Sequence, residues 1–117
     1  MLTMTLDEEL REPAAGPLSL HLDVQAEATV VRLAGDLDLS GAHLLGEALI
    51  DAQALGLPVV VDCSALAFID SSGIAELVAA RNRTGQLTLA GLPPVVLGTL
   101  QIAAVTDLFD LLPAPPR

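Results

Sequence analysis

The chain has 117 residues and a formal net charge of −10, from fifteen carboxylates, five arginines and no lysine. This balance excludes nucleic acids and anionic membranes as natural partners, because neutralising phosphates requires clustered cations. Just over half of the residues are apolar but only two are aromatic, so we expect one domain whose core is built from Leu, Val, Ile and Ala.

The N-terminal residues 1–17 mix acidic residues, Pro and Gly, which predicts a mobile lead-in to the domain. Its first residues, MLTMTLDEELREP, lack the pattern of a signal peptide, and no apolar run in the chain approaches the roughly 18 residues of a membrane span. Cys63 is the single cysteine, which fits a reducing compartment and favours a packed core position over a redox role. We therefore expect a cytoplasmic protein without membrane insertion.

Two strands are expected next. Residues 18–27 alternate apolar and polar side chains, which predicts a half-buried strand. Residues 28–35 (ATVVRLAG) predict a second strand, and the short connection between the two indicates a hairpin. The first strand should therefore pair antiparallel with the second.

A helix follows, with Ser40 as its expected cap and Gly56 as its end. Its apolar residues recur at helical spacing: Leu44, Leu45, Ala48, Leu49 and Ala52. Residues 57–64 (LPVVVDCS) are a continuous apolar run of the kind found in central strands. A second helix is expected over residues 72–85, where Ile74, Leu77, Val78 and Arg81 share one stripe.

The last third of the chain predicts a short strand at residues 86–91 and, after Pro93 and Pro94, a helix over residues 95–109. A short edge strand can precede the irregular, Pro-rich tail. Since strand–helix–strand units have right-handed crossovers, the second, third and fourth strands should be parallel. The fold class is therefore α/β: a small mixed sheet of four to five strands, mostly parallel, with an antiparallel N-terminal edge strand and three or more helices.

The stretch Asp70-Ser71-Ser72-Gly73 joins the third strand to the second helix and has several interpretations. A serine N-cap, worth about 1 kcal/mol, explains one of the four residues. A hydrolase nucleophile would need a Gly-x-Ser-x-Gly turn and a His base, and nothing in the sequence places His21 or His43 beside Ser71.

Nucleotide and metal sites have less support. The chain has no phosphate-binding Gly-x-x-x-x-Gly-Lys motif, and Asp36 and Asp38 have no accompanying His or Cys spacing, so we expect no cofactor and no metal. A phosphate on Ser71 is also open, because a helix start presents free N–H groups and a partial positive charge. It would add about −1.5 to −2 charges and could release a docked partner without unfolding the domain.

Three segments of the chain resemble STAS domains, specifically the anti-sigma factor antagonists of bacteria. Residues 59–83 (VVVDCSALAFIDSSGIAELVAARNR) look like their core signature, residues 31–45 like their upstream Gly-acid-Leu-Asp element, and residues 87–109 like their closing strand, Pro turn and helix. The resemblance covers residues 18 to 110 and implies three parts: a flexible segment at 1–17, a STAS domain at 18–112 and a Pro-rich tail at 113–117.

The resemblance implies a binding module and phosphoacceptor substrate, not an enzyme. Family members bind an anti-sigma factor that is also a serine kinase of the histidine-kinase-like ATPase type, and thereby free a sigma factor for transcription, as in stress responses. The kinase phosphorylates the serine that matches Ser71, which abolishes binding, and a PP2C-type phosphatase reverses this. Asp38 and Asp70 match the family's aspartates beside the acceptor, Ser72 and Gly73 complete the motif, and Asp36 is expected nearby.

The last helix departs from the family, whose members often carry basic residues at the positions of Val95, Leu97 and Gly98. An apolar helix is normally buried, here beneath the Pro-rich tail, or else forms a homodimer or partner surface. STAS domains also occur as subunits that do not switch. The alternative function is therefore a subunit docking on a stressosome-like assembly or on the ATPase of an ABC-type lipid transporter.

Overall fold

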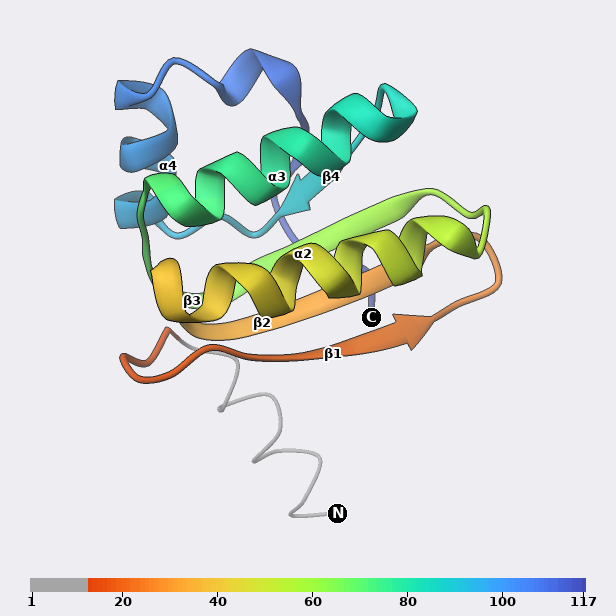
Figure 1. Cartoon of the computed structure of the whole chain (residues 1–117), viewed down its shortest axis with the longest axis horizontal. Coiled ribbons are helices and arrows are strands. Elements are labelled where there is room, and N and C mark those ends of the chain that lie inside the picture. The colour runs from red at the N-terminus through yellow and green to blue at the C-terminus, as the bar shows by residue number, and fades with distance from the viewer. Residues whose placement is uncertain (1–12) are drawn as a thin grey trace.

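The computed structural model describes residues 13–117, which form a five-stranded sheet with three α-helices (Figure 1). The strands follow one another across the sheet in chain order: β1 (Ser19–Val24), β2 (Thr29–Leu37), β3 (Val59–Ile69), β4 (Thr88–Ala90) and β5 (Asp110–Leu112). β1 pairs antiparallel with β2, and all other pairs are parallel. The predicted fold class, hairpin and parallel strands are therefore confirmed.

The connecting helices are α2 (Leu39–Ala54), α3 (Ser71–Thr84) and α4 (Pro94–Ile102). α2 and α3 lie side by side over the sheet, and α4 lies at the end where α3 begins (Figure 1). One aliphatic core joins all three helices to the same face of the sheet, which we call the inner face. Its fully buried members include Val31, Leu45, Leu49, Val61, Leu77, Leu89, Val96 and Leu100.

The C-terminal ends of α2 and α3 follow the glycine signals in the sequence. α3 ends at Gly85, whose φ of 83° is the left-handed conformation that only glycine adopts without strain. α2 ends before Gly56, which also has a positive φ. Along α2, the expected stripe is buried at Leu45 and Leu49, while Leu44 is 45% exposed.

The prediction for the third strand was too short. β3 continues past Ser64 to Ile69, because register shifts opposite β2 let the strand bend and still pair with the end of β2. Cys63 therefore lies inside the strand, 1% exposed, and burial raises the pKa of its thiol, with a smaller contribution from the charge of Asp62. The prediction of a packed cysteine is confirmed.

The prediction for the last helix was wrong in two respects. α4 ends at Ile102 rather than continuing to Phe109, because Ala104 turns to a φ of 59° and a short 3₁₀ turn follows. The Pro-rich tail does not bury α4 either: Val95 is 67% and Ile102 90% exposed. Only one side of α4 packs on the core. The other side stays exposed, because the Pro-rich tail lies on the opposite face of the sheet.

The tail crosses the opposite face of the sheet, which we call the outer face (Figure 1). The side chains on this face include Val30, Arg32, Val60, Asp62 and Ala90. The predicted mobile lead-in of residues 1–17 lies mostly outside the described residues, which begin at residue 13. Gly16 and Pro17 are held to the end of β2, because the amide of Asp36 donates to the Gly16 carbonyl over 2.8 Å. No helix in the described part of the chain is long and apolar enough to cross a membrane.

Candidate functional site

Two helix starts lie next to each other at one end of the sheet. β2 and β3 are adjacent parallel strands whose last residues, Leu37 and Ile69, are paired in register. The amide of Asp70 donates to the Leu37 carbonyl over 3.1 Å, which extends the ladder one step beyond β3. Each strand then enters a helix through an aspartate, Asp38 or Asp70. This carboxyl end of parallel strands is where α/β folds place their functional residues.

Asp70, and not a serine, caps α3. One oxygen of its carboxylate, Oδ1, accepts hydrogen bonds from the amides of Ser72 (2.9 Å) and Gly73 (3.4 Å). These amides are among the N–H groups that a helix start leaves without a partner, and Asp is as effective a cap as Ser. The interpretation of Ser71 or Ser72 as the helix cap is therefore wrong, because Asp70 is the N-cap residue of α3.

The same geometry recurs at α2, where Asp38, rather than the predicted Ser40, is the cap. Asp38 Oδ1 accepts from the amide of Ser40 (3.1 Å) and from its hydroxyl (2.7 Å). The hydrogen bond from the Ser40 side chain is the main reason why the pKa of Asp38 lies below its ordinary value. The chain thus uses Asp-x-Ser-Gly twice, at residues 38–41 and 70–73.

Ser71 makes no side-chain contact that stabilises the start of α3 among the described residues. It is the first residue of α3, its side chain is exposed, and its hydroxyl makes no hydrogen bond within residues 13–117. A hydroxyl at this place faces solvent at the positive end of the helix. It can accept a phosphoryl group without breaking any contact seen in the fold.

Gly73 fixes how closely α3 approaches β2. A Cβ at this position would overlap Cγ of Leu37 and lie 3.1 Å from the Leu37 carbonyl oxygen. Only glycine therefore allows the start of α3 to pack against the end of β2. This contact between Gly73 and Leu37 joins the segment that carries Ser71 to the segment that carries Asp38.

Asp36 has a different environment from the other predicted site residues. It lies on β2 opposite Phe68, and its carboxylate accepts from the amide of Gly16 over 3.3 Å. Asp36 therefore secures the segment before β1 to the sheet. The other predicted site residues form the paired helix starts: Asp38, Asp70, Ser71, Ser72 and Gly73.

Two exposed apolar side chains at this end of the sheet, Leu39 and Phe68, were missed from the sequence. Leu39, directly after the Asp38 cap, is 77% exposed, and Phe68, near the end of β3, is 45% exposed. Val95, in the first turn of α4, is also exposed. The first residue of a capped helix usually faces solvent, so the cap at Asp38 was the signal that could have revealed Leu39.

Neither histidine is hydrogen-bonded to Ser71 or Ser72 among the described residues. His21 is exposed on β1, and His43 pairs with Glu47 of its own helix over 3.0 Å. No group of three metal-binding side chains occurs among residues 13–117. A shallow depression at the opposite end of the sheet is lined by Gln53, Gly56, Leu57, Pro58, Val59, Thr84, Gln86 and Thr88.

Comparisons with known proteins agree with this geometry. A family model described as "Mlab, STAS domain" matches residues 20–113. An anti-sigma factor antagonist from Mycobacterium paratuberculosis superposes with a TM-score of 0.78 at 22% identity, covering 86% of this chain and 92% of that chain. No curated protein sequence matches.

The anti-sigma factor antagonist SpoIIAA is similar in two states. Its unphosphorylated form superposes with a TM-score of 0.65 and the phosphorylated form, from Bacillus, with 0.59. Both are 21% identical and cover 80% of this chain, and 87% and 90% respectively of their own. At this identity the likeness establishes the shared fold.

Proposed function

The chain belongs to the STAS domain family, and we propose that it is an anti-sigma factor antagonist switched by phosphorylation of Ser71. The unphosphorylated protein binds an anti-sigma factor and so releases a sigma factor. Two structural neighbours described as anti-sigma factor antagonists, the protein from Mycobacterium paratuberculosis and SpoIIAA, support the first part of this proposal. On this proposal the protein is a binding module and a substrate of other enzymes, acting in the cytoplasm.

The observation that carries the proposal is the exposed, unbonded hydroxyl of Ser71 beside a complete cap. Because Asp70 already satisfies the amides of Ser72 and Gly73, Ser71 is not needed to hold the helix. An exposed acceptor that contributes little to stability can be modified and restored repeatedly while the fold persists.

A phosphate on Ser71 would change the character of this end of the molecule. The exposed Leu39 and Phe68 offer apolar contact area at the same end of the sheet as Ser71. A group with about −1.5 to −2 charges would add a hydrated anion to this end, which already carries the carboxylates of Asp38 and Asp70. Desolvating such a group in an interface costs several kcal/mol, so the docked partner is released.

We propose that the bound anti-sigma factor is itself the kinase, of the histidine-kinase-like ATPase type, and that a PP2C-type phosphatase removes the phosphate. A kinase must bring its ATP to the serine hydroxyl, so its active site has to approach the start of α3. The same surface therefore serves docking and phosphorylation. The net charge of −10 suits a basic docking surface around the kinase site.

The proposal is tested by capture from the native cytoplasm with four full-length baits: wild type, Ser71→Ala, Ser71→Asp and Ala79→Asp. Ala79 is exposed on α3, about two turns after Ser71, so Ala79→Asp controls for added charge on the same helix. We expect wild type and Ser71→Ala to retain an ATPase-type kinase, and Ser71→Asp to lose at least about tenfold. The recovered kinase with ATP should then label wild type at Ser71 but not Ser71→Ala.

The opposite result has a definite meaning. If all four baits retain the same partner equally, Ser71 is not a switch, and the chain acts as a constitutive docking subunit. The retained protein, a stressosome-like component or a transporter ATPase, then identifies the complex. If Ala79→Asp releases the partner as fully as Ser71→Asp, general charge and not the acceptor position controls binding.

A further inference from the structure

The outer face of the sheet is covered by the chain's own tail. All three helices pack on the inner face, yet Val30 is 0% and Val60 7% exposed on the outer face, where they are direct partners between β2 and β3. Pro115 and Pro116 of the tail are half-buried, and Pro115 lies against Gly91 at the end of β4. Figure 1 shows the chain's end behind the middle of the sheet.

Two side chains of the sheet hold the tail by its backbone. Nη2 of Arg32 donates to the Pro116 carbonyl, and Nε2 of Gln25 donates to a carbonyl oxygen of Arg117, each over 2.9 Å. Arg32 comes from β2, and Gln25 directly follows β1. The tail therefore meets donors from two separate segments at successive residues.

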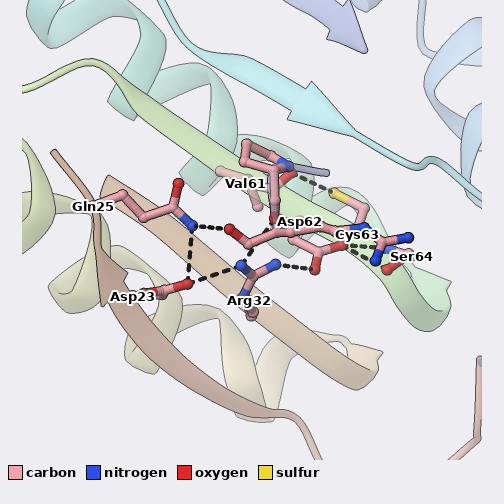
Figure 2. Close-up of polar contacts among 9 residues, drawn as sticks. Asp23, Gln25, Arg32, Val61, Asp62, Cys63 and Ser64 are labelled. Atoms are coloured by element: carbon pink, nitrogen blue, oxygen red, sulfur yellow. Dashed lines mark hydrogen bonds and ion pairs between the residues drawn. The ribbon is translucent and has the colours of Figure 1, made fainter. Parts of the chain in front are cut away.

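Arg32 is held in place before it meets the tail. Nη1 donates to Asp62 over 3.1 Å and Nη2 to Asp23 over 2.8 Å, as Figure 2 shows. Burial acts to lower the pKa of Arg32, but the hydrogen bonds to the two carboxylates outweigh it and raise the pKa. Asp23 also accepts from Gln25 over 3.1 Å, so one carboxylate orients both donors.

The chemistry of this face matches a proline-rich segment in particular. Proline has no N–H, so residues such as Pro115 and Pro116 offer only carbonyl acceptors. The face in turn offers donors to the tail, because Arg32 has only N–H donors and Gln25 points its NH₂ group at the tail. The proline residues themselves bring no N–H group that would need an acceptor. Proline-rich segments are also extended before they bind, which lowers the entropy lost on docking.

We propose that the outer face is a binding site for an extended, proline-rich segment. Residues 113–117 occupy it in the isolated chain, and a proline-rich segment of a partner protein replaces them when they leave. The site is lined by aliphatic side chains and by the Arg32–Gln25 donor pair. It lies on the outer face, whereas Ser71 starts a helix that packs on the inner face, so this inference does not rest on the proposed phosphorylation switch.

The test uses full-length chains and a synthetic peptide of residues 111–117. In the chain Pro115→Ser/Pro116→Ser, the tail gains two N–H groups and loses its extended preference, so it should vacate the face. We expect the peptide to shift the amide NMR signals of β2 and β3 in this variant, and to bind wild type at least about tenfold more weakly because its own tail competes. Adding Gln25→Ala should weaken the binding again, and a peptide carrying serine at positions 115 and 116 should not bind.

Two results would overturn the proposal. One is a folded Pro115→Ser/Pro116→Ser chain that shows no peptide-dependent shifts. The other is equal binding by wild type and variant, because the peptide would then occupy a site other than the tail's.

If the Pro115→Ser/Pro116→Ser chain fails to fold, the order of the wild-type tail can still refute the proposal. The amides of Ala114 and Arg117 should have order parameters near the roughly 0.85 of rigid backbone if the tail is docked. Values under about 0.6 would show a free tail and refute the proposal. Gln25→Ala should lower the value at Arg117 more than the value at Ala114.

Discussion

Individual side chains at the paired helix starts have separable roles. Asp70 and Asp38 stabilise the helices, Gly73 sets the packing distance, and Ser71 takes no part in either. The sequence predicted where the helix begins, but assigned the cap to serine, since Asp and Ser are equally good caps and both occur in the motif. The choice depends on where β3 stops, and the hydrogen bond from Asp70 to Leu37 of the neighbouring strand determines that point.

Replacing the cap should cost stability, whereas replacing the proposed acceptor should not. Asp70→Ala removes the acceptor for the amides of Ser72 and Gly73, and we expect a loss of about 1 kcal/mol in the free energy of unfolding. Ser71→Ala should stay within about 0.5 kcal/mol of wild type. Urea denaturation followed by circular dichroism measures both, and a larger loss for Ser71→Ala would return the capping role to the serine.

Two buried helical glycines should respond in opposite ways to alanine. At Gly73 a methyl group would overlap the branched side chain of Leu37, and we expect Gly73→Ala to destabilise the protein by about 1 to 3 kcal/mol. At Gly46 a methyl group would meet only the flexible carboxylate end of Glu76, which can move. Gly46→Ala should therefore be neutral or stabilising by up to about 1 kcal/mol, through helix propensity. Thermal unfolding of the two variants side by side tests the contrast.

Among the elements, α4 differs most from its prediction. Residues 95–109 contain no proline, and their single glycine, Gly98, lies in the middle of α4, so neither residue type indicated where the helix ends. The chain turns at Ala104 because Leu100 and Phe109 both have to reach the core, and a continued helix could not bring them there together with β5. Tertiary packing overrides local propensity here, and the strain at Ala104 is its local cost.

Relieving that strain should stabilise the protein. Ala104→Gly removes the Cβ from a residue with a φ of 59°, and we expect a gain of about 0.5 to 1 kcal/mol after allowing for the greater freedom of glycine when unfolded. Its neighbour Ala103 is also exposed but has an ordinary φ of −74°, so Ala103→Gly should instead lose stability. Equal losses in both variants, measured by urea denaturation, would show that the turn is unstrained.

Across the whole molecule, the order of elements and the strand directions could be predicted because they follow from periodicity and crossover handedness. The polar network of the outer face could not. Arg32 bonds to a partner 30 residues away and to another 84 residues away, and no local pattern encodes such pairs. The alternation of residues 18–27 indicated only which residues of β1 share a face.

Removing one partner of the buried Arg32–Asp62 pair should cost more stability than removing both charges together. Arg32→Met leaves Asp62, 3% exposed, without its cation, and we expect a loss of about 3 to 5 kcal/mol. Asp62→Asn in the same chain removes the unpaired charge and keeps Oδ1 as the acceptor for the Ser64 amide and hydroxyl. The double variant should thus recover most of the loss. Denaturation midpoints of single and double variants test this, and an undiminished loss in the double variant would contradict it.

The shortness of β5 has a consequence for solubility. Its three residues are exposed and form one open edge of the sheet, and Pro113 follows immediately. An open edge with free N–H and C=O groups invites pairing with another chain, and proline prevents the edge from lengthening. The protein therefore offers a second molecule too little backbone there to start an intermolecular sheet, even though Leu111 and Leu112 are exposed.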